Sequence, residues 1–329
     1  MQLNKVNEVN TTRALQSIWL SDGTTRAALT KELGLVKSTV SRIVNLLLEK
    51  GLVREIPDAP ARTGVGRKPV HLEINEQYGH ILGLEIQTDF FNAVLINLRG
   101  DVVETWSGPV SMDHKDAAAI LLDIMKRLRR PLRKLRVRLI GIGVALAGII
   151  DQRNGVILQS NPLNITEPVH FVREVRKKTK VPVIVENDAN CCCWGELAFR
   201  RTSRHKNFLF VLGEFRTGET GSNLYWGIAV GLGLVLDGKV FHGASFSAGE
   251  FQSILWKPGN EGQFSLTDEE ARRIKDDPEI MRHAFRELAS HVAFLVNTLN
   301  LTNVVFGGEI SEYKETLLPI VETEIQKNW

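Results

Sequence analysis

The chain of 329 residues contains little cysteine and no long hydrophobic run. Its three cysteines are the consecutive Cys191, Cys192 and Cys193, a spacing that suits neither an ordinary disulfide nor a metal site. We interpret them as buried free thiols on a helix in a reducing compartment. No signal peptide is visible, and no apolar run reaches the roughly 18–20 residues that a membrane helix needs. The sequence therefore predicts a cytoplasmic protein.

Excess charge is also scarce, because the formal net charge at pH 7 is only +3. Residues 1–80 contain 11 Lys and Arg against 8 Asp and Glu, whereas the rest of the chain holds 30 of each sign. All of the excess positive charge thus lies in the N-terminal quarter, where a contact with DNA would need it. The length favours two or three domains, each large enough for its own core.

The segment from residue 26 to residue 52 predicts two short helices joined by a tight turn. The first spans about 26–33, with Ala27, Ala28, Leu29 and Leu33 toward a core, and is followed by Gly34, which tolerates a left-handed C-cap. The second spans about 38–50, with Ser38 as N-cap and apolar residues at helical spacing. This is typical of a helix-turn-helix, whose second helix enters the major groove. Its outer face carries side chains that can hydrogen-bond bases and phosphates, namely Lys37, Ser38, Thr39, Ser41, Arg42 and Asn45.

The flanking segments fit a winged helix over residues 1–74. A helix at about 10–20 would brace the pair, and residues 52–56 and 70–74 alternate like the strands of a hairpin. The loop between these strands is rich in Gly, Pro and Arg, and it forms the predicted wing. Its Arg62, Arg67 and Lys68 suit a phosphate backbone or a narrow minor groove. The alternatives are an amphipathic helix pair of an unrelated fold and an inert, solvated loop.

After a linker at 75–80, strands alternate with helices, twice over. The pattern predicts an α/β domain over 81–329, with two similar lobes at roughly 81–190 and 191–329 and a ligand cleft between them. The basic run 126–138 could be a second nucleic-acid patch, but positive charge near a helix C-terminus is favourable by itself, and we interpret it as a solvated surface. The expected strands are 83–87, 91–98, 102–107, 137–145, 181–185, 208–213, 224–236, 239–241 and 303–306, and the expected helices are 116–130, 168–178, 189–199, 267–276, 278–299 and a last one from 311.

Motifs along nearly the whole chain resemble those of the ROK family (repressor, open reading frame, kinase), and its regulators in particular. The winged-helix segment with its TGVGRKP wing looks typical of these regulators, and the other matches are GVALAGIID at 143–151, NPL at 161–163, VENDAN at 185–190, GLGLVLDGK at 231–239, GASFSAGEF at 243–251 and NVVFGGEIS at 303–311. The resemblance implies a winged helix joined to an actin-like, hexokinase-like (ribonuclease H-like) scaffold of two lobes. Kinase members of the family phosphorylate sugars. Regulator members bind operators of sugar-utilisation genes and respond to a sugar or to a transporter protein.

Two departures from the family argue against a kinase. The family's first phosphate loop resembles D-x-G-G-T, whereas residues 85–89 read EIQTD, without the glycines and with an extra carboxylate. The second loop resembles G-T-G-I-G, whereas residues 227–231 read GIAVG. The chain also ends about twenty residues after Glu309, so we expect a shortened C-terminal lobe. We predict that the protein is not an enzyme and needs no cofactor.

The sugar-contacting positions of the family are better kept. The resemblance implies sugar contacts at Asn161, Asn187, Asp188 and Glu250, with Asp188 in the place of the kinases' catalytic base. A base without a phosphoryl donor transfers nothing, so this one would be vestigial. The family's zinc-binding His is replaced by Gln252, which we include as a fifth contact, and the family's C-x-C-G-x-x-G-C cluster is absent, so no metal is expected. The alternative is a cleft that binds nothing.

The sequence thus predicts a sugar-responsive transcriptional repressor. Its expected partners are a double-stranded DNA operator and a sugar bound between the lobes, with no membrane partner. Because one winged helix contacts few base pairs, we expect a homodimer or a tetramer. Two alternatives are a ROK-type sugar kinase with a DNA-binding appendage and a regulator switched by a partner protein, with an inert cleft.

Overall fold

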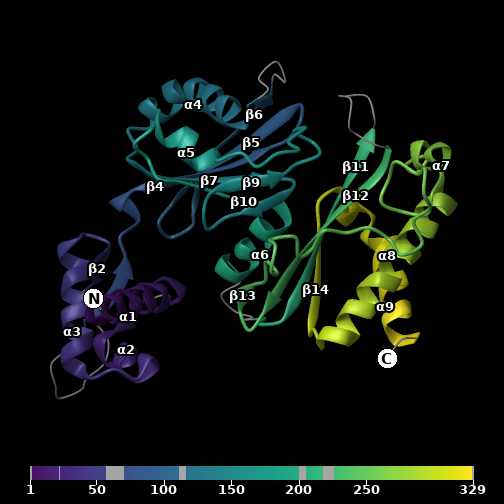
Figure 1. Ribbon diagram of the computed structural model, residues 1–329. Helices are drawn as coiled ribbons and strands as arrows, with labels where there is room; N and C mark the ends of the chain where they lie inside the picture. Colours follow the sequence, from purple (N-terminus) through teal and green to yellow (C-terminus); the bar gives the residue numbers. More distant parts are fainter. Residues whose placement is uncertain are drawn as a thin grey trace. The chain divides into compact units, whose positions relative to one another are not determined.

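The computed structural model describes residues 2–21, 23–56, 70–110, 116–199, 205–217 and 226–327 (Figure 1). These residues fall into two compact units. One comprises those within 1–82, 94–105 and 132–141, and the other comprises those within 83–93, 106–131 and 142–329. The domain boundaries given above stay a prediction. Among the described residues, no helix combines the length and the apolar character that crossing a membrane requires.

The first unit contains a three-helix arrangement with a small antiparallel sheet. The sheet has the order β1-β3-β2, and Val53 of β2 lies opposite Ile74 of β3. The predicted apolar stripe of the third helix is buried, and it packs with Leu29 and Leu72 in one core. The elements are α1 (Gln2–Leu20), β1 (Thr24–Thr25), α2 (Arg26–Leu33), α3 (Lys37–Glu49), β2 (Val53–Ile56) and β3 (His71–Ile74).

Local details of this unit correct the prediction. Gly34 ends α2 with a left-handed φ of 65°, as expected. Ser38 is not the N-cap of α3, because Val36 occupies that position and its carbonyl accepts hydrogen bonds from the backbone N–H groups of residues 39 and 40. In α2 only Leu29 is buried, while Ala27 and Ala28 are exposed. A helix this short buries only a narrow stripe of its side chains against the core.

The same unit includes a turn that lies far along the chain. Trp19 Nε1 donates a hydrogen bond of 2.6 Å to the backbone carbonyl of Leu98, whose side chain packs against the winged-helix core. Arg99 Nη1 lies 3.6 Å from a carboxylate oxygen of Glu73. The residues predicted as a linker form η1 (Glu76–Tyr78) and the start of the next strand, and the Arg138 guanidinium lies 5.1 Å from the centre of the Tyr78 ring.

A five-stranded sheet has the order β10-β7-β4-β5-β6. Its α4 runs to Lys134 and includes Pro131, where the sequence predicted a stop, and Arg127 of α4 donates to the Pro109 carbonyl at the end of β6 over 2.6 Å. A short hairpin of β8 and β9, which the sequence analysis missed, follows β7. The elements are β4 (His80–Ile86), β5 (Phe90–Asn97), β6 (Val102–Pro109), α4 (Ala117–Lys134), β7 (Leu139–Leu146), β8 (Ile149–Asp151), β9 (Val156–Gln159), α5 (Phe171–Arg176) and β10 (Val183–Asn187).

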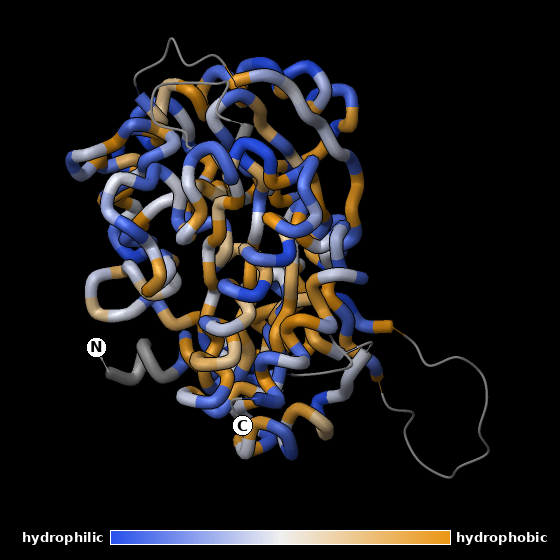
Figure 2. The backbone as a smooth tube through the Cα atoms, turned by 90° about the vertical axis from the view of Figure 1, so that its right-hand side faces the viewer, coloured by the Kyte–Doolittle hydropathy of each residue, from blue (hydrophilic) through white to orange (hydrophobic). Residues whose placement is uncertain are grey.

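A second sheet, of order β13-β12-β11-β14, has α6 on one face and α8 and α9 on the other (Figure 1). Successive residues of β11 point to opposite faces: Phe208 and Phe210 pack with Cys193 of α6, whereas Leu209 and Val211 pack with α8 and α9. All four residues are hydrophobic, so this part of β11 is buried on both faces. In Figure 2, hydrophobic (orange) and hydrophilic (blue) stretches follow one another along the backbone. The elements are α6 (Asp188–Phe199), β11 (Phe208–Thr217), β12 (Trp226–Leu236), β13 (Lys239–Val240), α7 (Asp268–Arg272), α8 (Pro278–Leu299), β14 (Asn303–Gly307), η2 (Glu309–Tyr313) and α9 (Lys314–Lys327).

The cysteines lie where the sequence predicted, on a helix. Cys193 is buried, Cys191 and Cys192 are half-buried, and all three are free thiols on α6. Burial raises the pKa of each thiol, to about 12 for Cys192. Because the thiolate is the reactive form, a raised pKa lowers the reactivity of these thiols at neutral pH.

Candidate functional site

The outer face of α3 presents the polar side chains that the sequence singled out. Lys37, Ser38, Arg42 and Asn45 are exposed, and Thr39 and Ser41 are half-buried. The opposite stripe of α3 fills the core, so its helical period alone fixes which side faces outward. The wing residues Arg62, Arg67 and Lys68 lie outside the described residues.

Two of these side chains have partners on neighbouring elements. Arg42 Nη2 donates to Asn7 Oδ1 over 2.9 Å, and Arg26 Nη2 donates to Asn45 Oδ1 over 3.3 Å. Arg26 also forms an ion pair with Glu55, with 2.7 Å between Nη1 and Oε1. Exposed contacts of this kind contribute little free energy, so a phosphate or a base edge can replace them.

The residue before α3 was missed by the sequence analysis. The Val36 side chain is 66% exposed, although valine is normally a buried residue. It adjoins the exposed Lys37 and Ser38 at the N-terminal end of the helix. An apolar side chain there can contact the methyl group of thymine.

A cavity of about 160 Å³, lined by both polar and apolar residues, lies in the second unit. Four of the five predicted sugar-contacting residues line it, and they come from the β9 end, the β10–α6 junction and the segment after β13. Gln252 does not line it: its neighbours Phe251 and Ser253 are buried, so the Gln252 side chain points to solvent. The lining residues are Ala147, Gly148, Ile149, Gln159, Asn161, Pro162, Asn187, Asp188, Leu212, Glu214, Arg216, Ala229, Val230, Gly231, Glu250 and Gln263.

The junction of β10 and α6 places two of these residues. Asn187 Nδ2 donates to the Gly148 carbonyl over 3.1 Å, and its Oδ1 accepts from the Asn190 backbone N–H over 3.0 Å. Asn187 therefore ties the turn after β7 to the first turn of α6. The turn after β7 needs glycine at residue 148, because Gly148 has a φ of 137° and a Cβ there would lie 2.3 Å from the Gln159 carbonyl oxygen.

The cavity is rich in carboxylates. Burial raises the pKa of Asp188, with a further rise from the Glu85 carboxylate, and burial followed by the charge of Asp188 raises the pKa of Glu250. Burial, Glu309 and Glu85 raise the pKa of Glu214 to about 7, although Arg216 acts in the opposite direction. Three carboxyl groups and a single guanidinium thus line the cavity.

The segment aligned with the first kinase phosphate loop and the glycine pair of the NVVFGGEIS motif are both engaged in protein contacts. Glu85 accepts hydrogen bonds of 2.9 Å from the side chains of Gln87 and Asn92. Gly308, with a φ of 74°, allows the chain to approach β11, since a Cβ there would lie 2.4 Å from the Gly213 carbonyl oxygen. Packing alone therefore requires this glycine.

Four polar lining residues were not predicted as sugar contacts, namely Gln159, Glu214, Arg216 and Gln263. Glu214 and Arg216 lie two apart on β11, and polar residues at that spacing in an otherwise apolar strand were an available signal. Gln263 lies in a segment without helix or strand, and no local pattern marks it. Within the described ranges, no group of three or more His, Cys, Asp and Glu side chains could hold a metal ion.

Comparisons with known proteins assign the chain to a protein family. The model of the ROK family matches residues 81–262, and that of the MarR family matches residues 10–62. The chain therefore belongs to the ROK family, and its fold is a winged helix-turn-helix followed by an actin-like, hexokinase-like domain of two lobes.

Among its curated relatives is a xylose repressor of Bacillus subtilis, 28% identical over 278 residues, which are 82% of this chain and 68% of that protein. The DNA-binding transcriptional dual regulator NagC of Escherichia coli is 23% identical over 340 residues, with 91% and 80% covered.

Two solved structures share the fold. A ROK family transcriptional regulator described as a homolog of the Escherichia coli MLC protein has a TM-score of 0.76 at 21% identity, covering 98% of this chain and 88% of that one. A ROK family glucokinase from Streptomyces griseus, in complex with glucose and AMPPNP, has a TM-score of 0.55 at 17% identity, covering 76% and 89%.

Proposed function

We propose that the protein is a sequence-specific DNA-binding repressor of sugar-utilisation genes, controlled by a sugar in the cavity. One observation carries the proposal: the same chain presents an outward-facing polar recognition helix and a cavity lined by the family's sugar-contacting positions. The relatives named xylose repressor and NagC support it.

The DNA-reading surface would combine α3 with the wing. Ser38, Thr39, Ser41, Arg42 and Asn45 would contact base edges, with Val36 against a thymine methyl group. Lys37 would contact the phosphate backbone, as would the wing residues Arg62, Arg67 and Lys68. A homodimer or tetramer would place two such helices on the half-sites of a palindromic operator.

The cavity suits an uncharged polyhydroxyl ligand. Asp188, Glu214 and Glu250 would accept hydrogen bonds from sugar hydroxyls, while Arg216 would donate and the Asn161 amide could do either. The same carboxylates would repel the phosphates of a nucleotide, so we propose that the protein does not transfer phosphate and that Asp188 is no longer a base. Control requires the sugar to bind the DNA-competent and DNA-incompetent states with different affinities.

The test is a titration of operator DNA from the upstream region of the gene at fixed salt, repeated with a panel of uncharged sugars. We expect one sugar to shift operator affinity about tenfold, which corresponds to about 1.4 kcal/mol of coupling. Tight DNA binding with no effect of any sugar would refute sugar control and favour a partner protein as the switch. Phosphorylation of a sugar by ATP, lost in Asp188→Asn, would favour the kinase.

A further inference from the structure

The backbone around Glu250 is joined to β12 by very few hydrogen bonds. Gly231 and Glu250 form an isolated antiparallel bridge, and the Leu232 N–H donates to the Gly249 carbonyl over 2.9 Å. The following segment, residues 251–266, contains neither helix nor strand. Something other than a sheet must therefore hold Glu250 at the cavity.

Residues 251–266 correspond to the region that carries the zinc-binding residues in other members of the family. The residues of this chain do not fit that metal. Zinc is bound by Cys, His, Asp and Glu side chains. The segment's own polar side chains that form these hydrogen bonds are instead the amides and hydroxyls of Ser253, Asn260, Gln263 and Ser265. The His and Glu side chains of α8 that contact the segment do not make a metal site either, because no group of three or more His, Cys, Asp and Glu side chains in the described ranges could hold a metal ion.

We propose that Gln263 is the positioning residue for Glu250, and that a buried carboxylate, Glu287, secures the segment carrying Gln263 in place of a metal. This inference rests on the proposed function, in which Glu250 contacts the sugar. It assigns a role to a residue that no motif marks.

The Gln263 amide joins the two chain segments on either side of the Gly231–Glu250 bridge. Its Oε1 accepts from the Val230 N–H over 2.6 Å, and its Nε2 donates to the Val230 and Phe251 carbonyls over 3.0 and 2.7 Å. The Gln263 side chain thus forms the hydrogen bonds with β12 that a neighbouring strand would otherwise form, and it also lines the cavity. Only an amide both accepts and donates twice, so neither glutamate nor methionine can reproduce these bonds.

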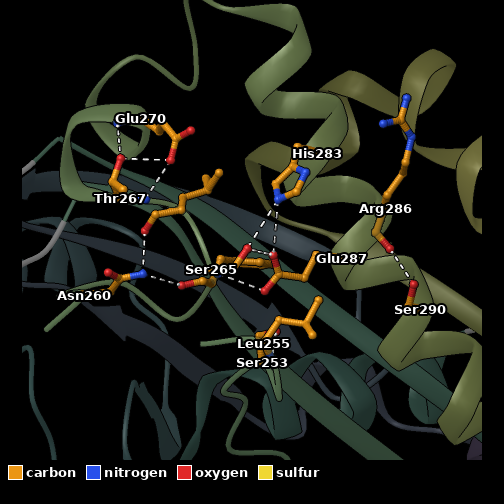
Figure 3. A network of polar contacts seen from close by, with 12 residues as sticks. Ser253, Leu255, Asn260, Ser265, Thr267, Glu270, His283, Arg286, Glu287 and Ser290 are labelled. Atoms are coloured by element: carbon orange, nitrogen blue, oxygen red, sulfur yellow. Dashed lines mark hydrogen bonds and ion pairs between the residues drawn. The ribbon is translucent and has the colours of Figure 1, made fainter. Parts of the chain in front are cut away.

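The segment carrying Gln263 is in turn fixed to α8 (Figure 3). Glu287, only 4% exposed, accepts hydrogen bonds from the Ser265 N–H over 2.9 Å and from Ser265 Oγ over 2.6 Å. His283 Nε2 lies 3.3 Å from the same Ser265 oxygen. Asn260 Nδ2 donates to the Leu266 carbonyl over 2.8 Å and closes the segment on itself.

A second histidine of α8 completes the attachment. His291 Nε2 lies 3.0 Å from the Ile254 N–H, from which it accepts, while its Nδ1 donates to the Glu287 carbonyl over 2.7 Å. His283, Glu287 and His291 are spaced four residues apart, so they form one stripe along α8. This stripe holds residues 254–265, and Gln263 transmits the constraint to the chain at Glu250.

The test compares the same substitution at two glutamines of this segment in the full-length protein. Gln263→Glu removes both donated bonds, whereas Gln252→Glu places the same charge on an exposed side chain outside the cavity. The readouts are hydrogen exchange at residues 248–252 and the shift in operator affinity produced by the active sugar of the panel, with D-xylose as the first probe.

We expect Gln263→Glu to speed exchange at residues 248–252 at least tenfold and to weaken the sugar response at least tenfold, with sugar-free operator affinity within twofold of wild type. Gln263→Met should do the same without adding charge. Gln252→Glu should leave both readouts within twofold. Unchanged exchange in the Gln263 variants would overturn the proposal.

Two further arms separate the alternatives. If wild type responds to no sugar, sugar control fails, yet hydrogen exchange still decides the role of Gln263. Treatment of wild type with EDTA should change neither readout. A loss that added zinc restores would show a metal at the segment and would overturn the replacement of metal by Glu287.

Discussion

Helix α3 and the cavity of the second unit draw their polar groups from the sequence in opposite ways. On α3, one continuous stretch of sequence supplies every polar group, and the buried stripe on its other side fixes their direction. The cavity draws its groups from segments between residues 147 and 263 and surrounds carboxylates whose pKa values are raised. The outer face of α3 therefore depends on one well-packed core beneath the helix. The lining of the cavity depends instead on backbone segments that approach each other closely.

The largest effect should come from the core beneath the recognition helix. Leu47→Ala removes a side chain that is 1% exposed, so we expect the free energy of unfolding of this unit to fall by about 2–5 kcal/mol. The neighbouring Leu46, 38% exposed, is the matched control, and Leu46→Ala should cost less than about 1 kcal/mol. Urea denaturation followed by circular dichroism measures both. Equal losses would show that α3 faces the core differently.

The second-largest effect should come from the close backbone contact between Gly148 and Gln159 at the cavity. Gly148→Ala forces a Cβ against the Gln159 carbonyl at a positive φ, and we expect a loss of about 3 kcal/mol in stability together with loss of the sugar response. Gly143→Ala on β7 is the control, because a Cβ there meets nothing within 4 Å. Thermal denaturation and the operator titration report the two effects. A fully active Gly148→Ala protein would contradict the assigned geometry.

Removal of a recognition side chain should alter operator binding without altering stability. Arg42→Ala should weaken operator binding by about 1–3 kcal/mol, and loss of a phosphate contact would also lower the salt dependence by about one unit of slope. Lys50→Ala, at the C-terminal end of α3, should have a smaller effect because base contacts come from the N-terminal part of a recognition helix. Fluorescence anisotropy at several salt concentrations distinguishes the two variants. Equal effects would place the contact surface elsewhere.

The smallest effect concerns the charge of the cavity. Because the pKa of Glu214 is raised to about 7 in the folded protein, its ionisation lowers stability as the pH rises from the ordinary glutamate range through 7. Glu214→Gln should therefore stabilise the protein by about 1 kcal/mol at pH 8, a value reduced by solvent screening, and by much less at pH 5. Melting temperatures at both pH values test this.

Where local pattern decides the structure, the sequence was sufficient. The bounds of α2, the strands of the hairpin and the buried stripe of α3 agree with the prediction, because 3.6- and 2-residue periods record burial directly. The assignment of Ser38 as N-cap was wrong, because the helix already begins at Lys37. Its N-cap is Val36, which uses its backbone carbonyl and forms no side-chain cap hydrogen bond, so no polar residue marks this position in the sequence. The end predicted for α4 at residue 130 was wrong because the helix continues through Pro131.

The cavity shows the limit of such patterns. Of the positions that motif resemblance suggested, Asn161, Asn187, Asp188 and Glu250 line the cavity, whereas Gln252 is exposed outside it. Contact of these residues with a sugar stays a prediction. Gln263 is joined to residues 230 and 251 by hydrogen bonds that span the tertiary structure. No period in the sequence encodes such a contact. The residues that place functional groups are therefore harder to find than the functional groups themselves.

The unit that contains the winged helix also includes residues from 94–105 and 132–141. The chain consequently passes between the two units at five points, rather than through one linker. The unit that contains the winged helix is therefore not one continuous piece of sequence, and a fragment ending at residue 82 would lack its residues from 94–105 and 132–141.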